Sequence, residues 1–182
     1  MAILPVAHMG AEVLKRRADE IADFTDPALP GLVNDMIDTM FAQVGVGLAA
    51  PQVFAPKRVV VFYVPKGRNA GDEIPLTVMV NPVITPITDT QEEQYEGCLS
   101  VPGLTGKVPR WTKIRYSWQD LKGNRFEREA ENFHARVVQH ECDHLDGVLY
   151  PMRMKDMTTL AFVEALQAER EKAGQPKAEI VD

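Results

Sequence analysis

Apolar residues recur at helical spacing in several parts of the chain, and these parts predict its helices. From residue 29 to residue 44 an apolar side chain returns every three or four positions over about four turns, which favours a core-packing helix. Asp26-Pro27 stands before it as a cap residue followed by a proline at the first helical position. Weaker amphipathic patterns predict a short helix over residues 10–24 and a last helix over residues 156–172.

Runs of β-branched and aromatic residues predict the strands. These runs cover residues 58–64, 76–80, 83–88, 113–118 and 125–129. Asn81-Pro82 is expected to end the second run, and Lys122-Gly123-Asn124 is expected to join the last two runs as a hairpin. Helices, then strands, then a further helix indicate an α+β fold.

A further helix, predicted to end near residue 146, has more than one face to bury. Its first stripe consists of Phe133, Val137, His140 and His144. A second, apolar stripe consists of Ala135, Val138, Cys142 and Leu145. Gly147 suits the residue that stops a helix. A helix with two faces to bury lies inside the fold, so polar groups on its first stripe are expected to sit in a largely dry site.

His140, Glu141 and His144 form the pattern H-E-x-x-H on this helix. Residues four apart lie about one turn apart on the same face, so the two imidazoles can bind one metal ion. Glu141 follows the first of them and can act as a base on a water bound there. The pattern has only three fixed positions and also arises by chance, but the helix that it needs is predicted independently. We therefore expect a metal-dependent hydrolase.

Two histidines leave the metal site incomplete, because catalytic sites of this kind usually have three protein ligands and one open position. A metzincin protease would carry a third histidine where Tyr150 stands. A thermolysin-like protease would use a glutamate from a later helix, and Glu164 is within reach in sequence. A thiolate from upstream is the remaining option, and Cys98 supplies one.

Composition and charge indicate the type of protein and the partners that it is expected to bind. The chain has 182 residues, 45% of them apolar and 25% charged, which is typical of one globular domain. Its net charge of −6 indicates neither a DNA-binding nor a membrane-binding surface. No apolar run approaches the roughly 20 residues of a membrane span, and no signal peptide is evident, so we expect a cytoplasmic protein. Cys98 and Cys142 are then expected to stay reduced, and residues 174–182 to form a loose polar tail.

Three segments, taken together, point to a known family. They are GVGLAAPQ at residues 45–52, EGCLS at residues 96–100 and QHECDHLDG at residues 139–147. In this order and spacing they resemble the motifs of peptide deformylases, which remove the formyl group from the N-terminal formyl-methionine of new bacterial or organellar proteins. The resemblance covers nearly the whole chain. It implies a single catalytic domain over residues 1–182, with small mixed or antiparallel sheets around a central metal-binding helix and a C-terminal helix.

The resemblance also implies a role for each motif residue. The implied metal ligands are Cys98, His140 and His144, with water in the fourth position. The implied metal is Fe²⁺, with Ni²⁺, Co²⁺ or Zn²⁺ as substitutes. Glu141 would take the proton of the water and pass it to the leaving amine. The Gln52 side chain and the Leu99 backbone N–H would stabilise the oxygen of the tetrahedral intermediate, as fixed donors do.

Substrate contacts follow from the same resemblance. The backbones of Val46, Gly47 and Gly97 would pair with the substrate as an added strand, a mode that tolerates many sequences. Phe133 and Val137 are candidates, with Val46, for an apolar pocket around the methionine side chain, although both also suit plain core packing.

Supporting roles are expected for a few other polar residues. Glu96 and Ser100 are expected to order the loop around Cys98, and Arg110 to form an ion pair with Asp143.

The remaining alternatives concern reaction and partner. A metalloendopeptidase with Glu164 as third ligand is the second hypothesis, but it leaves the Cys98 segment without a role. The expected partners are N-formyl-methionyl nascent polypeptides. Some bacterial deformylases dock on the ribosome through a basic C-terminal helix, whereas the last helix here mixes glutamates with Arg170 and Lys172. Neither a membrane nor DNA is expected as a partner.

Overall fold

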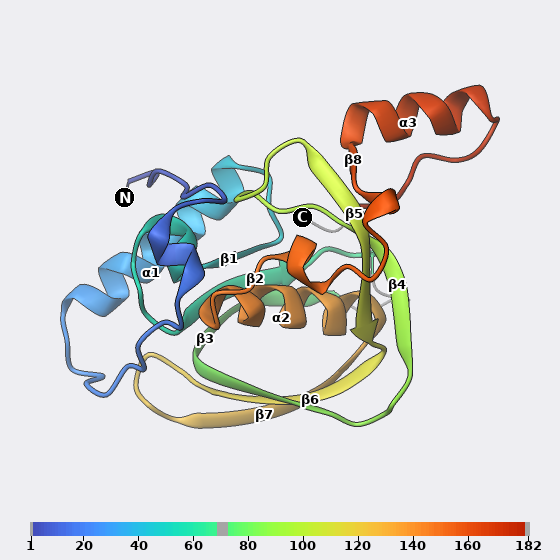
Figure 1. The fold of residues 1–182 in the computed structure, drawn as a ribbon. Helices are drawn as coiled ribbons and strands as arrows, with labels where there is room; N and C mark the ends of the chain where they lie inside the picture. The colour runs from blue at the N-terminus through green and yellow to red at the C-terminus, as the bar shows by residue number, and fades with distance from the viewer. Residues whose placement is uncertain (1, 69–72, 181–182) are drawn as a thin grey trace.

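Helix α2 (Asn132–Leu145) runs between two antiparallel sheets, and the other elements are arranged around it (Figure 1). The larger sheet has the order β1-β2-β3-β6-β7, with bounds Gly47–Ala49, Val59–Val64, Ile74–Pro86, Lys113–Gln119 and Arg125–Glu131. The smaller sheet has the order β4-β5-β8, with bounds Gln91–Glu96, Leu104–Trp111 and Ala161–Phe162. This computed structural model describes residues 2–68 and 73–180. The predicted α+β fold, with antiparallel sheets around a central helix, is confirmed.

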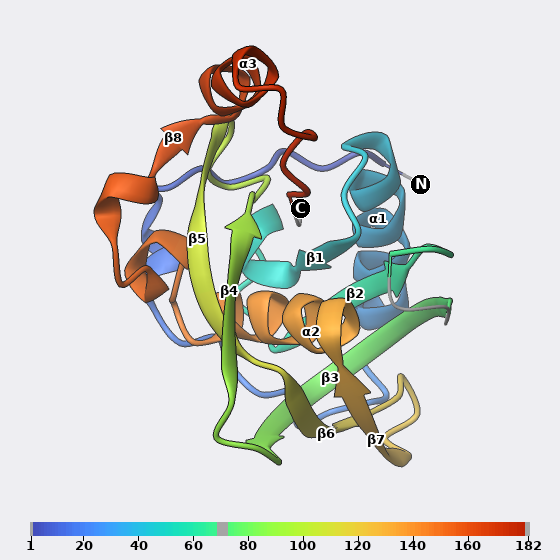
Figure 2. The same cartoon turned by 90° about the vertical axis from the view of Figure 1, so that its right-hand side faces the viewer.

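Helices α1 (Ala28–Ala42) and α3 (Val163–Lys172) lie well apart in both views (Figures 1 and 2). Short 3₁₀ helices cover Glu12–Lys15, Ala50–Val53, Tyr150–Arg153 and Met157–Thr159. Helix α1 begins one residue later than predicted, with Pro27 at its N-cap position, and Asp26 Oδ1 accepts the backbone N–H of Ala28 at 2.9 Å. Helix α1 buries Leu29, Val33, Met36 and Met40 in a cluster shared with strands β1 and β2. Helix α3 buries none of its residues.

Helix α2 is inside the fold, as its two stripes predicted. All of its residues after Asn132 are buried. Its apolar stripe packs in one cluster with Phe62, Ile114 and Tyr116 from the larger sheet. Gly147 ends the helical segment with φ of 72°, as expected for a left-handed stop.

The helix predicted over residues 10–24 is wrong, because only Glu12–Lys15 form a single 3₁₀ turn. Beyond that turn the backbone bonds to other segments of the chain. Ala18 N–H donates to Leu145 O at 2.8 Å, and Asp19 O accepts the N–H of Arg58 at 2.8 Å. These tertiary hydrogen bonds replace the ones a helix would have made.

The strand predicted to stop at Asn81-Pro82 instead continues to Pro86. The pairing of β3 with β6 shifts between Val80 and Val83, and Asn81 adopts φ of 50° there. The Asn81 side chain accepts the N–H of Ile21 at 2.9 Å. This irregularity lets the strand pass a proline without ending.

The smaller sheet was not predicted from the sequence. Its strand β4 reads QEEQYE, and β5 contains a glycine and a proline, so neither shows apolar alternation. The helix predicted from Asp156 begins only at Val163. Asp156 instead caps the Met157–Thr159 turn, and Ala161–Phe162 then pair with β5 as strand β8.

The predicted hairpin at Lys122-Gly123-Asn124 is confirmed. Strands β6 and β7 pair in register up to Gln119 and Arg125. The Asp120 carboxylate accepts N–H groups of Lys122 and Asn124 at 2.8 and 2.9 Å. Among the residues that the structure describes, no helix is long and apolar enough to cross a membrane.

Candidate metal centre

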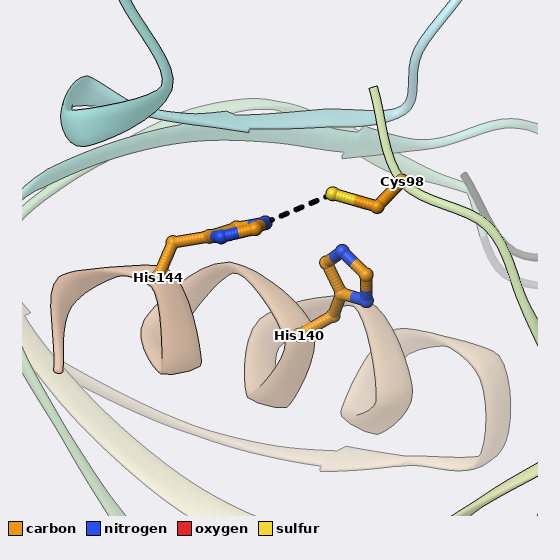
Figure 3. Close-up of side chains that lie close together, drawn as sticks. All are labelled: Cys98, His140 and His144. Carbon is orange, nitrogen blue, oxygen red and sulfur yellow. Dashed lines mark hydrogen bonds between the residues drawn. The ribbon is translucent and has the colours of Figure 1, made fainter. Parts of the chain in front are cut away.

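Cys98, His140 and His144 form a buried cluster whose candidate ligand atoms all lie within 4.8 Å of one another. Cys98 Sγ lies 3.3 Å from His144 Nε2. Both histidines project from the side of α2 that faces Cys98, which follows strand β4 (Figure 3). One thiol and two imidazoles are donors that transition metals accept in tetrahedral sites. The residues present therefore fit one metal ion.

Glu96 orients the first histidine of the cluster. His140 Nδ1 lies 2.9 Å from Glu96 Oε2. Burial raises the pKa of Glu96, but the charge and hydrogen bonds of Arg110 and the bond to His140 outweigh this and hold it well below its usual range. An ionised carboxylate only accepts, so Nδ1 is the donor and Nε2 is left for the cluster. Carboxylate partners of this kind fix the ring of a metal-binding histidine.

A buried network of charges surrounds Glu96. Arg110 binds it through two N–H groups, each at 2.9 Å, and Arg136 Nη1 binds it at 2.8 Å. Arg110 also reaches Asp143 at 2.6 Å, so the expected ion pair is confirmed. Such a network is stable only because each buried charge has partners.

Glu141 comes directly after His140 on α2, and its buried position changes the pKa of its carboxyl group. Its side chain is buried, and burial raises its pKa to about 7. Its Oε2 atom has no hydrogen-bond partner among the described residues. A carboxyl group with a pKa near neutrality is suited to accept and return a proton.

Gln52 directs its amide N–H groups at the cluster. Its Oε1 accepts the backbone N–H of Ala49 at 2.8 Å, which fixes the orientation of the amide. Its Nε2 then lies 3.2 Å from Ser100 Oγ and 3.6 Å from Cys98 Sγ. Gln52 therefore presents an N–H donor close to Cys98. Ser100, which was expected to order the loop around Cys98, accepts a hydrogen bond from Gln52.

The residues predicted to bind substrate fall into two groups. Gly47 is the first residue of β1, an edge strand of the larger sheet, and Val46 directly precedes it. The Val46 carbonyl already accepts the N–H of Tyr63 at 2.9 Å. Gly97 and Leu99 flank Cys98 in the chain. Phe133 and Val137 are buried in the cluster against which Val46 packs.

Glu164 does not belong to the site. It is exposed in the first turn of α3, which lies away from α2 in both views (Figures 1 and 2). Tyr150 is buried, and its ring centroid lies 6.4 Å from that of His140. The structure therefore gives no support to the endopeptidase hypothesis.

Arg136 and the anchoring role of Glu96 were not predicted from the sequence. A signal was present, since Arg136, Gln139 and Asp143 form a polar stripe on a helix expected to be buried. Charged residues on such a helix need buried partners of opposite charge. The sequence did not indicate which residues those partners were.

Fold and site together define an α+β enzyme with a candidate metal centre on its central helix. Residues 3–159 match the family model described as polypeptide deformylase. Peptide deformylase 2 of Ralstonia nicotianae is 49% identical over 169 residues, 92% of this chain and 96% of that protein. Peptide deformylase 1 of Nitrosomonas europaea is 47% identical over 166 residues, 90% of this chain and 94% of that protein.

Solved structures agree with these relatives. A Met-Ala-Ser-bound class I type b peptide deformylase from Acinetobacter baumannii has a TM-score of 0.78 and 38% identity, covering 84% of this chain and 99% of that one. A peptide deformylase from Thermotoga maritima has a TM-score of 0.78 and 36% identity, covering 86% of this chain and 100% of that one. The chain belongs to the polypeptide deformylase family. The family is metal-dependent and acts on formylated nascent polypeptides.

Proposed function

We propose that this chain, as one catalytic domain, removes the formyl group from N-formyl-methionyl nascent polypeptides and releases formate. One observation carries the proposal: the Gln52 amide lies 3.6 Å from Cys98 Sγ, and the buried Glu141 carboxyl comes directly after His140 on α2, so both belong to the surroundings of the Cys98, His140 and His144 cluster. This arrangement provides a base and an oxyanion donor around one centre. A formamide is a poor electrophile, so its hydrolysis needs both.

Cys98, His140 and His144 would hold one divalent metal ion. We propose Fe²⁺ as this ion, with Ni²⁺, Co²⁺ or Zn²⁺ able to replace it. When bound, the metal would lower the pKa of a water molecule and polarise the formyl oxygen. Affinity alone does not decide which metal a cell loads, so ligand chemistry that also suits zinc does not exclude iron.

The residues of the chain then move the proton and stabilise the charge. Glu141 accepts the proton of the attacking water and donates it to the amine of the leaving methionine. Its raised pKa, about 7, suits both halves of this transfer. The Gln52 amide and the Leu99 backbone N–H donate to the formyl oxygen as negative charge develops on it.

The substrate would bind as an added strand beside β1. Residues of an antiparallel strand direct their polar groups alternately to opposite sides. The Val46 carbonyl faces β2, so the Gly47 backbone faces the open edge and is the main partner on this side. Gly97 would pair from the other side. Phe133, Val137 and Val46 would enclose the methionine side chain.

The proposal places the protein in the cytoplasm, where formylated chains are made. It includes contact with the ribosome through the exposed surface of α3. Lys172 pairs with Glu169 there at 2.6 Å, so this surface is mixed in charge rather than basic. Co-sedimentation with ribosomes at low and physiological salt tests this contact.

The reaction is tested with two peptide substrates. Metal-loaded protein is expected to release formate from formyl-Met-Ala-Ser. It is expected to leave intact an acetylated peptide of similar length with several internal bonds. Cleavage of internal bonds without release of formate would overturn the proposal in favour of an endopeptidase.

A further inference from the structure

Arg68 covers the outer face of a residue assigned above to the methionine pocket. Its guanidinium carbon lies 4.6 Å from the ring centroid of Phe133. Phe133 is only 9% exposed, whereas Arg68 is exposed in the segment that follows β2. A guanidinium stacked on an aromatic ring keeps its N–H groups free at the edge for planar acceptors.

That edge already binds a peptide carbonyl. Arg68 Nη2 donates to the backbone carbonyl of Ile180 at 2.8 Å, across 112 positions of sequence. Ile180 belongs to the segment that follows α3. In Figure 2 this segment descends from α3 toward β1 and α2, where the candidate centre lies. The Ile180 contact shows that the Arg68 guanidinium can bind a main-chain carbonyl at this position.

Side chains of α3 hold the same segment by its backbone. The Gln167 amide accepts the N–H of Ala178 at 2.9 Å and donates to its carbonyl at 3.0 Å. Arg170 Nε donates to the carbonyl of Pro176 at 2.7 Å. These contacts recognise main-chain groups, so the segment is held as an extended peptide would be. Ala178 and Ile180 are accordingly only partly exposed.

We propose that Arg68 forms an outer subsite that binds a main-chain carbonyl of the substrate beyond its formyl-methionine, and that residues 176–180 occupy this subsite between turnovers. The proposal rests on the proposed function. Binding through a carbonyl ignores side-chain identity, which suits an enzyme that must accept many nascent chains. Helix α3 buries no residue, so the segment it carries is easily displaced.

The first test compares Arg68→Met with the matched control Lys66→Met, an exposed lysine of the same segment. Both are combined with Gln167→Ala and Arg170→Ala, so that residues 176–180 are released in each and only the contact with substrate differs. Formate release is measured for formyl-methionine methylamide, which has no carbonyl beyond its methionine, and for formyl-Met-Ala-Ser-Ala-Ser. Arg68→Met is expected to raise KM for the longer peptide roughly 3- to 10-fold, as loss of one hydrogen bond to a charged group does, with kcat unchanged. KM for formyl-methionine methylamide is not expected to rise. Equal KM values for Arg68→Met and Lys66→Met with the longer peptide would overturn the subsite.

The second test releases the segment in the full-length chain. Gln167→Ala combined with Arg170→Ala removes its holding contacts, and Glu169→Ala with Lys172→Ala is the control on the same helix. Apparent affinity falls with the fraction of enzyme that is occupied, so release is expected to lower KM for the longer peptide about 2- to 10-fold. Adding a synthetic peptide of residues 173–180 should then raise KM for the longer peptide again.

Different results would overturn the occupancy by residues 176–180 and the proposed function. Identical KM values for the two double variants would overturn the occupancy by residues 176–180. Absence of formate from every variant and from the unmodified protein would instead overturn the proposed function.

Discussion

Gly47 lies so close to Glu141 that a β-carbon at position 47 would overlap the Glu141 carboxyl group. The backbone of β1 therefore forms one wall around the proposed general base. Glycine is required here because the two chains approach closely, and not because of an unusual backbone angle, since Gly47 does not have a positive φ. This contact joins the first sequence motif to the H-E-x-x-H helix.

Gly47→Ala is expected to displace the Glu141 carboxyl while leaving the metal ligands in place. A misplacement of about 1 Å can cost roughly 10²-fold in rate, so kcat should fall by about that factor with metal content unchanged. Gly45→Ala is the matched control, because its β-carbon would approach most closely the movable side chain of Leu99, at 3.2 Å, and would lie at ordinary contact distances of 3.4 and 3.7 Å from the backbone oxygens of Gly47 and Met40. Equal activity of the two variants would contradict this reading of the contact.

Glu141→Gln is expected to keep the metal and lose almost all activity. The amide fills the same space but cannot accept a proton, and general acid–base catalysis is worth roughly 10²–10⁴-fold. Metal content and formate release are measured on the same preparation. Activity near that of the unmodified protein, at full metal occupancy, would remove Glu141 from the mechanism.

Gln52→Leu is expected to fold and bind metal normally while losing roughly 10²–10³-fold in kcat, as loss of one oxyanion donor does. Steady-state kinetics with formyl-Met-Ala-Ser separate the parameters. A raised KM at constant kcat would make Gln52 a ground-state binding residue instead.

Glu96→Gln is expected to weaken both folding and metal binding. It leaves Arg110 and Arg136 buried without their shared charge, which typically costs about 3–5 kcal/mol of unfolding free energy. It also removes the charged partner of His140, and such losses lower metal affinity about 10- to 100-fold. Denaturant unfolding and metal competition measure the two effects. Glu93→Gln, exposed on the same strand, is the control, and equal behaviour of the two variants would contradict the anchoring role.

Much of the fold was predictable where one segment carries its own pattern. Helix α1 and the β6–β7 hairpin have strong local periodicity, and both were predicted. Strand β4 has no apolar alternation and is a strand because it pairs with β5. The segment after Lys15 has helical spacing, yet its backbone bonds to Leu145 and Arg58. The structure of these two segments is therefore determined by hydrogen bonds to parts of the chain that are distant in sequence.

The site divides in the same way. The H-E-x-x-H pattern and its helix could be predicted from the spacing of residues. Cys98, in contrast, was one of several candidates for the third ligand, and only the resemblance to the family favoured it. The Glu96 carboxylate accepts hydrogen bonds from Arg110, Arg136 and His140, which lie 14, 40 and 44 positions away. No local pattern encodes contacts over such separations.

Cys98 is proposed to complete the metal centre with His140 and His144. Cys142 offers an internal control, because it packs in the core cluster and burial raises its pKa. An alcohol is a much poorer ligand than a thiolate, so Cys98→Ser should lose metal and iron-dependent activity, while Cys142→Ser should keep both. Air should inactivate the iron form by oxidising iron and Cys98, while a nickel-loaded form should keep its activity.

The most direct measurement is therefore metal content and formate release of Cys98→Ser and Cys142→Ser, both purified without oxygen. We expect the Cys98→Ser protein to be poor in metal and inactive, and the Cys142→Ser protein to be loaded with metal and active. Loss of metal from Cys142→Ser together with its retention by Cys98→Ser would contradict the assigned third ligand and the proposed mechanism with it.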